Sequence, residues 1–325
     1  MHDRTAANRE AIQPTRVHPA TKVAGPAPLP AVDRLRPTAP QRRRARRTPW
    51  SYARWVVLAL VLIFFLFPIY WMLITSFKGI SLWTRYPPLF YPDAIHFENY
   101  ADALFHWGGL KGLEDSAIVC TTTTILSMLI GVPAGYSIAR FRIGGRNYAF
   151  WILSILFLPP VAVVVPLFNL WSGNDFPWLN LIDTYQVLII QYTVFNVPFV
   201  VWVMKGFFED VPQELEDSAL VNGTTRLRAL WDVVLPMVRP GLGTTALFVF
   251  IFSWSEFLFA LILTRRNVTT LPFILPTLME GHSIKWGDIA AIATIAACPL
   301  VIIAFLLQRY LVAGFSFGAI RQRSS

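Results

Sequence analysis

The sequence predicts an all-α integral membrane protein with six transmembrane helices and a helical element on its cytoplasmic side. Two properties of the composition indicate this: 55% of the 325 residues are hydrophobic and only 14% are charged. A third is that six apolar runs reach the length of about 20 residues that a membrane-spanning helix needs. The runs are Trp55–Phe77, Ser116–Ala139, Asn147–Asn174, Thr184–Met204, Gly241–Thr264 and Ile289–Gln308.

A soluble helical bundle is the main alternative, and the near-absence of charged residues from the runs excludes it. Helices of a soluble protein carry charged residues on their solvent face. Five of the runs contain no Asp, Glu, Lys or Arg, and Gly241–Thr264 contains only Glu256. We therefore expect a multi-pass protein of the cell membrane, that is, the inner or plasma membrane.

The basic residues predict the orientation of the chain, because Lys and Arg accumulate on the cytoplasmic side of membrane proteins. Both termini and the loops after the second and fourth runs are accordingly predicted to be cytoplasmic. The basic stretch before the first run favours contact with anionic membrane lipid over nucleic acid. The residues counted are Arg42, Arg43, Arg44, Arg46, Arg47, Arg54, Arg140, Arg142, Arg146, Lys205, Arg226, Arg228, Arg239, Arg309, Arg321 and Arg323, in a chain of net charge +9.

The predicted organisation has four parts. Residues 1–48 are rich in Pro, Ala, Arg and Thr and are predicted to be a disordered cytoplasmic tail. The first transmembrane helix and an outer loop follow in 49–112, a transmembrane core in 113–309, and a cytoplasmic C-terminal tail in 310–325. Cys120 and Cys298 fall in predicted spans and favour packing roles. No metal-ligand spacing is present, so neither a metal nor a cofactor is predicted.

Several predicted spans contain proline, which removes a helix hydrogen bond and bends the helix. Bent spans can line a transport pathway, where the freed carbonyls find other partners, but they also occur in ordinary packing. Both interpretations stay open. The prolines are Pro133, Pro159, Pro160, Pro166 and Pro198.

Four polar residues within the spans are candidates for a substrate pathway. Glu256 carries a charge in the fifth run, and Ser253 lies about one turn away on the same face. Tyr192 and Asn196 share one face of the fourth run. A charge in the membrane costs about 2.5–3.5 kcal/mol and normally faces protein or water. These residues either bind a polar solute or hold the helices together by hydrogen bonds.

The stretch Val211–Pro240, called the polar segment below, is more elaborate than a loop between spans requires. Pro212 suits the first position of a helix over Gln213–Val221, and Gly223 suits its left-handed end. Thr224 or Thr225 can cap a second helix. Its apolar stripe comprises Leu227, Leu230, Trp231 and Val234, and Pro236 and Pro240 end it.

The polar segment resembles the E-A-A…G signature of ABC importer permeases, which forms a coupling helix seated in the ATPase subunit. Asp217, Ser218 and Ala219 match its acidic-Ala-Ala triplet. Asn222, Gly223 and Thr224 match the usual D-G-A, and Leu235, Pro236 and Pro240 match the closing L-P-x-x-x-P. The departures are conservative, although the acidic charge usual at Asn222 is lost.

Longer stretches resemble the second permease subunit of maltose-type carbohydrate importers over about residues 54–320. They are FFEDVPQELEDSA, FIFSWSEFLFALILT and QRYLVAGFSFGAI, while FLPPVAVVVPLF and WGDIAAIAT resemble the sugar-alcohol members. The resemblance implies a type I ABC importer permease with four partners: a homologous second permease, a dimer of ATP-binding subunits, an extracytoplasmic solute-binding protein, and a sugar or polyol substrate. It implies ATPase coupling through Glu214, Asp217, Ser218, Ala219, Asn222, Gly223, Thr224 and Pro236.

The chain lacks the phosphate-binding loop G-x-x-x-x-G-K-[ST], so we expect no catalytic residue and ATP hydrolysis by a partner. Two other classes of protein are alternatives. An ion-coupled secondary carrier or channel would use Glu256 as its ion or proton site, but would be expected to show inverted repeats and further intramembrane charges. The other is a structural assembly protein without a transport pathway.

Overall fold

The computed structural model describes residues 49–145, 147–174, 176–279 and 284–320, and these are helical or irregular, without a strand. The predicted disordered tail 1–48 and the last residues of the predicted C-terminal tail lie outside the described residues. The chain divides into two compact units, 1–58 and 59–325. The described part of the first unit, from residue 49, is helical. The contacts described below lie within the second unit.

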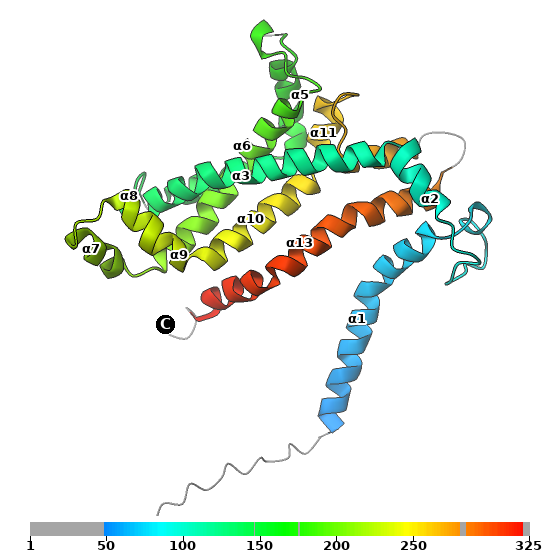
Figure 1. The fold of residues 1–325 in the computed structure, drawn as a ribbon, viewed down its shortest axis with the longest axis horizontal. Coiled ribbons are helices and arrows are strands. Elements are labelled where there is room, and N and C mark those ends of the chain that lie inside the picture. The colour runs from blue at the N-terminus through cyan, green and yellow to red at the C-terminus, as the bar shows by residue number, and fades with distance from the viewer. Residues whose placement is uncertain (1–48, 146, 175, 280–283, 321–325) are drawn as a thin grey trace, which may run out of the picture. The chain divides into compact units, whose positions relative to one another are not determined.

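Among the described residues, four helices are long and apolar enough to cross a membrane. The number rises to six if each of two bent pairs is one span, namely Tyr148–Phe157 with Pro160–Trp171 and Arg226–Met237 with Arg239–Trp254. The four are α1 (Pro49–Ser76), α3 (Gly109–Phe141), α6 (Tyr185–Glu209) and α13 (Trp286–Ile320) (Figure 1). They coincide with the first, second, fourth and sixth predicted runs. α3 and α13 extend beyond these runs. The boundaries predicted between parts of the chain, at 112/113 and 309/310, therefore both fall inside helices.

The third predicted run is sharply bent. α4 (Tyr148–Ser154) and the 3-10 turn η3 (Ile155–Phe157) meet α5 (Pro160–Trp171) at 86°. Leu158 and Pro159, which each precede a proline, have extended ψ angles of 121° and 124°. A residue before proline is disfavoured in the helical region, and two in succession therefore break the helix. Pro133 and Pro198, by contrast, lie inside continuous helices.

The fifth predicted run is broken as well, which corrects the expectation that Glu256 lies within a continuous spanning helix. α10 (Arg239–Trp254) ends just before Ser255, and α11 (Leu258–Leu263) begins after Phe257. The Glu256 carboxylate accepts a hydrogen bond from the Phe259 backbone N–H at 3.0 Å. A side-chain acceptor at this position satisfies a free N–H at the start of the second helix, which stabilises the break.

α3 and α6 pack closely along their length, since glycines on α3 remove side-chain bulk. A Cβ atom on Gly131 would lie 2.5 Å from Val200 Cγ1, and one on Gly135 would lie 3.1 Å from the Val201 carbonyl oxygen. Small residues allow such close approach between membrane helices. Together with α10, these helices form the frame on which the candidate sites are built (Figure 1).

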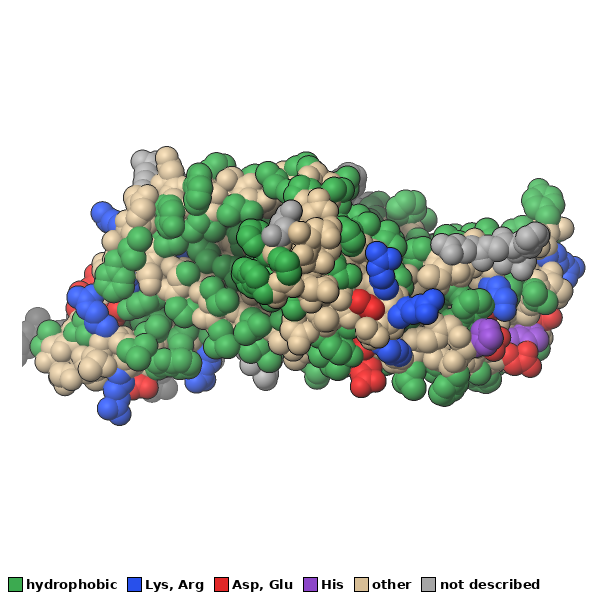
Figure 2. Space-filling model, turned by 90° about the horizontal axis from the view of Figure 1, so that it is seen from above, with side chains coloured by type: hydrophobic (Ala, Val, Ile, Leu, Met, Phe, Trp, Pro, Cys, Tyr) green, Lys and Arg blue, Asp and Glu red, His purple; other side chains and the backbone are tan. Residues whose placement is uncertain are grey.

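Shorter elements complete the unit. Their bounds are η1 (Ile80–Leu82), α2 (Glu98–Ala101), η2 (Asp102–His106), η4 (Pro177–Leu179), α7 (Gln213–Val221), α8 (Arg226–Ala229), η5 (Leu230–Val234), α9 (Leu235–Met237) and α12 (Leu271–Thr277). Hydrophobic side chains cover much of the middle of the face seen in Figure 2. Soluble monomers rarely expose so large an apolar surface, and it agrees with a protein that lies in lipid.

Candidate functional site

The first helix of the polar segment has the predicted bounds, because α7 spans Gln213–Val221. It ends in a Schellman motif: the Gly223 N–H donates to the Leu220 carbonyl at 3.0 Å and the Thr224 N–H to the Ala219 carbonyl at 3.2 Å. Gly223 has the left-handed φ of 85° that this motif requires. Pro212 is the residue before the first helical position, one place earlier than predicted.

α7 has one exposed face and one buried face. Glu214, Asp217, Ser218 and Val221 recur at spacings of three and four residues, which places them on one side of the helix, and all four are exposed. Val221 is 88% exposed. Asn222 and Gly223 are also exposed, while Ala219, Thr224 and Pro236 are half-buried. A negatively charged helix face with an apolar residue beside it is therefore free to contact a partner.

The second part of the polar segment is less regular than predicted. It consists of α8, the π-helical turn η5 and α9 in place of one helix, and Thr225 is the residue that caps it, accepting from the Arg228 N–H at 3.4 Å. The predicted apolar stripe divides into two faces: Leu230 (7% exposed) and Val234 (0%) are buried, whereas Leu227 (67%) and Trp231 (63%) are exposed.

The buried face of α7 carries a residue that the sequence analysis did not single out. Glu216 is 4% exposed and accepts a hydrogen bond from Arg140 Nε at 2.9 Å. The Tyr136 hydroxyl donates to its other carboxylate oxygen. Arg140 had been counted only for orientation. The local signal for Glu216 is its spacing of four residues from the half-buried Leu220, away from the face of Glu214 and Asp217.

The four candidate pathway residues lie around one cavity of about 150 Å³, lined by Leu156, Pro160, Tyr192, Phe195, Asn196, Phe252, Ser253, Glu256 and Phe259. Asn196 Nδ2 donates to the Tyr192 carbonyl at 2.8 Å and to Ser253 Oγ at 3.3 Å, which joins α6 to α10. The buried Tyr192 hydroxyl has no hydrogen-bond partner within the described part of the chain. The cavity thus offers a hydroxyl, an amide and a carboxylate.

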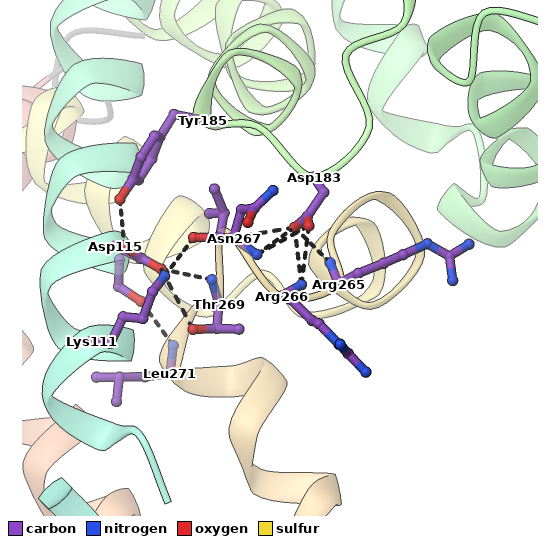
Figure 3. A network of polar contacts seen from close by, with 11 residues as sticks. Lys111, Asp115, Asp183, Tyr185, Arg265, Arg266, Asn267, Thr269 and Leu271 are labelled. Atoms are coloured by element: carbon purple, nitrogen blue, oxygen red, sulfur yellow. Dashed lines mark hydrogen bonds and ion pairs between the residues drawn. The ribbon is translucent and has the colours of Figure 1, made fainter.

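A second polar network, also not anticipated, fixes the segment after α11 (Figure 3). Asp183, with a φ of 64°, accepts hydrogen bonds from the consecutive backbone N–H groups of residues 265, 266, 267 and 268 at 2.9–3.3 Å. Burial raises the pKa of Asp183, but these backbone N–H groups lower it by more, so the pKa lies below its usual value.

Asp115 fixes the continuation of the same segment to α3 (Figure 3). Its carboxylate accepts from the Thr269 N–H at 2.7 Å, the Tyr185 hydroxyl at 2.6 Å and Lys111 Nζ at 2.7 Å. Asp115 and Arg140 are 25 positions apart on α3, which corresponds to about 37 Å. The Asp183–Asp115 network and the polar segment therefore lie at opposite ends of this helix.

Within the described residues no group of three or more His, Cys, Asp or Glu is arranged to hold a metal ion. The chemistry present is that of hydrogen-bonding groups around a cavity and a helical element displaying charged and apolar side chains. Such an arrangement binds partners and polar solutes.

Comparison with known proteins identifies the class. Residues 131–316, which contain the polar segment and the whole cavity lining, match the family described as "Binding-protein-dependent transport system inner membrane component". The chain belongs to this family. It is a permease subunit of an ABC transport system, a multi-pass protein of the inner membrane, and a transport component rather than an enzyme.

Individual relatives are also permease proteins of transport systems. The chain is 32% identical, over 86% of its length and 97% of the relative, to a probable ABC transporter permease protein y4oR of Sinorhizobium fredii. It is 31% identical, over 81% and 94%, to the trehalose/maltose transport system permease protein MalG of Thermococcus litoralis. It is also 31% identical, over 82% and 93%, to the sulfoquinovosyl glycerol transport system permease protein SmoH of Agrobacterium fabrum.

The fold is found in solved structures of ABC transporters. A chain of a bacterial transporter involved in the import of the acidic polysaccharide alginate superposes with a TM-score of 0.66 at 21% identity, over 80% of this chain and 96% of that one. A chain of the MetNI methionine transporter gives 0.52 at 18% identity, over 65% and 98%. The prediction of an ABC importer permease fold is confirmed.

Proposed function

We propose that this chain forms half of the translocation pathway of an ATP-driven importer for a sugar or sugar alcohol, with both termini in the cytoplasm. The observation that carries the proposal is the polar segment, a helical element whose α7 is attached to α3 on one face and exposed on the other. The named functions of the relatives, transport of trehalose/maltose and of sulfoquinovosyl glycerol, support a carbohydrate substrate.

The exposed face of α7 is the surface that docks on the ATP-binding subunit. We assign ATPase coupling to Glu214, Asp217, Ser218, Ala219, Asn222, Gly223, Thr224 and Pro236. All except Pro236, which lies in α9, belong to α7 or follow it directly. The negative charge on this face fits a basic cleft. A homologous second permease completes the pathway, and a solute-binding protein delivers the substrate from outside.

The cavity around Tyr192, Asn196, Ser253 and Glu256 is the part of the pathway that this chain contributes. Hydroxyl and amide groups recognise the hydroxyls of a neutral carbohydrate by hydrogen bonds, and Phe195 and Phe252 offer apolar surface to a sugar ring. A volume of about 150 Å³ is small for a whole disaccharide. In this proposal the second permease supplies the rest of the binding surface.

The docking role is tested with the complete transporter in proteoliposomes, using trehalose, maltose, mannitol and sorbitol as probes. Val221→Glu places a charge on the exposed face, and Val221→Thr is the control of equal size. We expect Val221→Glu to lose both ATPase co-purification and ATP-driven uptake, while Val221→Thr retains them. Normal uptake by Val221→Glu would refute the docking role. Uptake that stops when the proton gradient is collapsed at constant ATP would instead favour a carrier.

A further inference from the structure

Of the three acidic residues on α7, Glu216 alone faces inward. Glu214 and Asp217 are exposed, whereas Glu216 is buried together with Arg140, whose side chain is 7% exposed. Burying two charges is costly unless they pair and their remaining groups are hydrogen-bonded. The docking of α7 does not need a buried charge at this position, since its docking face lies on the other side of the helix.

The contacts of Glu216 connect α7 to α3 specifically. Arg140 and Tyr136, one helical turn apart on α3, occupy both carboxylate oxygens. Arg140 Nη2 also donates to the Val211 carbonyl at 3.1 Å, immediately before the start of α7. The start of α7 is thereby attached to α3, although α6 is the helix that precedes it in the chain.

The rest of the polar segment is attached in a different way. Leu230, Val234 and Val238 pack in an apolar cluster with Met204 and Phe208 of α6. Apolar contacts are non-directional, so such surfaces can shift while staying buried. A charge-assisted hydrogen bond to a guanidinium group constrains both distance and direction. The Glu216–Arg140 pair is therefore the contact that resists sliding between α7 and α3.

We propose that Glu216 and Arg140 are positioning residues that transmit a displacement of α7 to α3. This inference rests on the proposed docking of α7 on the ATP-binding subunit. α3 carries the displacement as a continuous helix over about 37 Å to Asp115. There Asp115 holds Thr269 and Tyr185, so the movement reaches the far end of the unit.

The test uses the complete transporter with three measurements: co-purification of the ATP-binding subunits, ATP hydrolysis, and solute taken up per ATP hydrolysed. Glu216→Gln keeps the size of the side chain and removes its charge. We expect assembly and hydrolysis to persist and uptake per ATP to fall by about twofold to thirtyfold, the range seen for substitutions in coupling networks. The double reversal Glu216→Arg with Arg140→Glu should recover part of the loss.

The matched control is Lys205→Gln, which removes a neighbouring ion pair, Lys205–Glu209 at 2.6 Å, that lies within α6 and does not involve α7. It should leave uptake per ATP unchanged. An unchanged ratio in Glu216→Gln overturns the proposal, and so does loss of the ATP-binding subunits with a normal ratio in the remaining complexes. If Glu216→Gln does not accumulate in the membrane, Arg140→Lys replaces it, and an unchanged ratio there is equally decisive.

The outcomes also separate this inference from the proposed function. If Val221→Glu leaves the ATP-binding subunits bound and uptake intact, the docking role of α7 fails and the transmission role fails with it. If Val221→Glu loses the ATP-binding subunits and uptake but Glu216→Gln behaves as wild type, only the transmission role fails.

Discussion

The Asp183 carboxylate is expected to stabilise the turn at residues 265–268 through charge as well as shape. Asp183→Asn tests this, because Asn tolerates the left-handed φ of 64° as well as Asp does and keeps the same size. The substitution removes the charge and replaces one acceptor oxygen with an NH₂ donor. That donor would face the N–H groups of Arg266 and Asn267, which now donate to Oδ2 at 3.1 and 3.0 Å.

The expected cost follows from the hydrogen bonds. A bond to a charged group contributes about 1.5–3 kcal/mol and a neutral one about 0.5–1.5 kcal/mol, so each of the N–H groups would lose roughly 1 kcal/mol. Asp183 is partly exposed, and water competes for the weakened bonds. We therefore expect a local loss of about 1–2 kcal/mol, which is about a fivefold to thirtyfold drop in amide protection.

The assay is hydrogen exchange of the amides of residues 265–268, each normalised to its intrinsic rate, in the purified full-length protein. The pKa of Asp183 is lowered on folding, so its contribution is complete above the unfolded-state pKa of about 3.9 and is lost as pH falls through the lower folded-state value. Wild-type protection should fall in that acidic window, and Asp183→Asn should lack this component. Equal protection in the two proteins at neutral pH would refute the reasoning.

Three further outcomes are expected. Gly131→Ala should destabilise the protein by about 1–3 kcal/mol, since its Cβ would lie 2.5 Å from Val200 Cγ1, and Val200→Ala should restore the melting temperature in detergent. Gly223→Ala should cost about 1–2 kcal/mol because of the left-handed φ of 85°, whereas Gly223→Asn should cost less; thermal unfolding distinguishes them. Glu256→Gln should retain the hydrogen bond to the Phe259 N–H and ATP-driven uptake, whereas Glu256→Ala should lower the melting temperature by removing a cap worth about 1 kcal/mol.

The elements with strong local signals were predictable from the sequence. The bounds of α7 follow from Pro212 before it and Gly223 after it, and the spans follow from long apolar runs. The breaks were harder to place. Pro159–Pro160 breaks a helix because two residues in succession precede proline. No proline or glycine marks the break before Leu258, where the Glu256 carboxylate accepts the Phe259 N–H.

The polar networks could not be predicted, because they join residues far apart in the sequence. Glu216 finds its partners 76 and 80 positions away, and Asp183 finds backbone groups more than 80 positions away. Nothing local distinguishes Glu216 from Asp217 except the helical face on which each lies. The candidate cavity is an intermediate case: the pairs Tyr192–Asn196 and Ser253–Glu256 were each visible from spacing, but their convergence on one cavity required the packing of α6 against α10.

Both breaks in the predicted spans adjoin that same cavity. Leu156 and Pro160 flank the break between α4 and α5, and Glu256 lies in the break between α10 and α11. Irregular backbone at membrane depth is tolerated only where protein buries it or a cavity provides partners, so two breaks beside one cavity favour a pathway over ordinary packing. The Asn196–Ser253 bond does serve packing, and the two interpretations of these residues are therefore compatible. Glu256 has a structural task, since its carboxylate accepts the Phe259 N–H at the start of α11. This cap accounts for an acidic residue at position 256 without ion coupling, so Glu256 is not by itself a reason to favour an ion-coupled carrier.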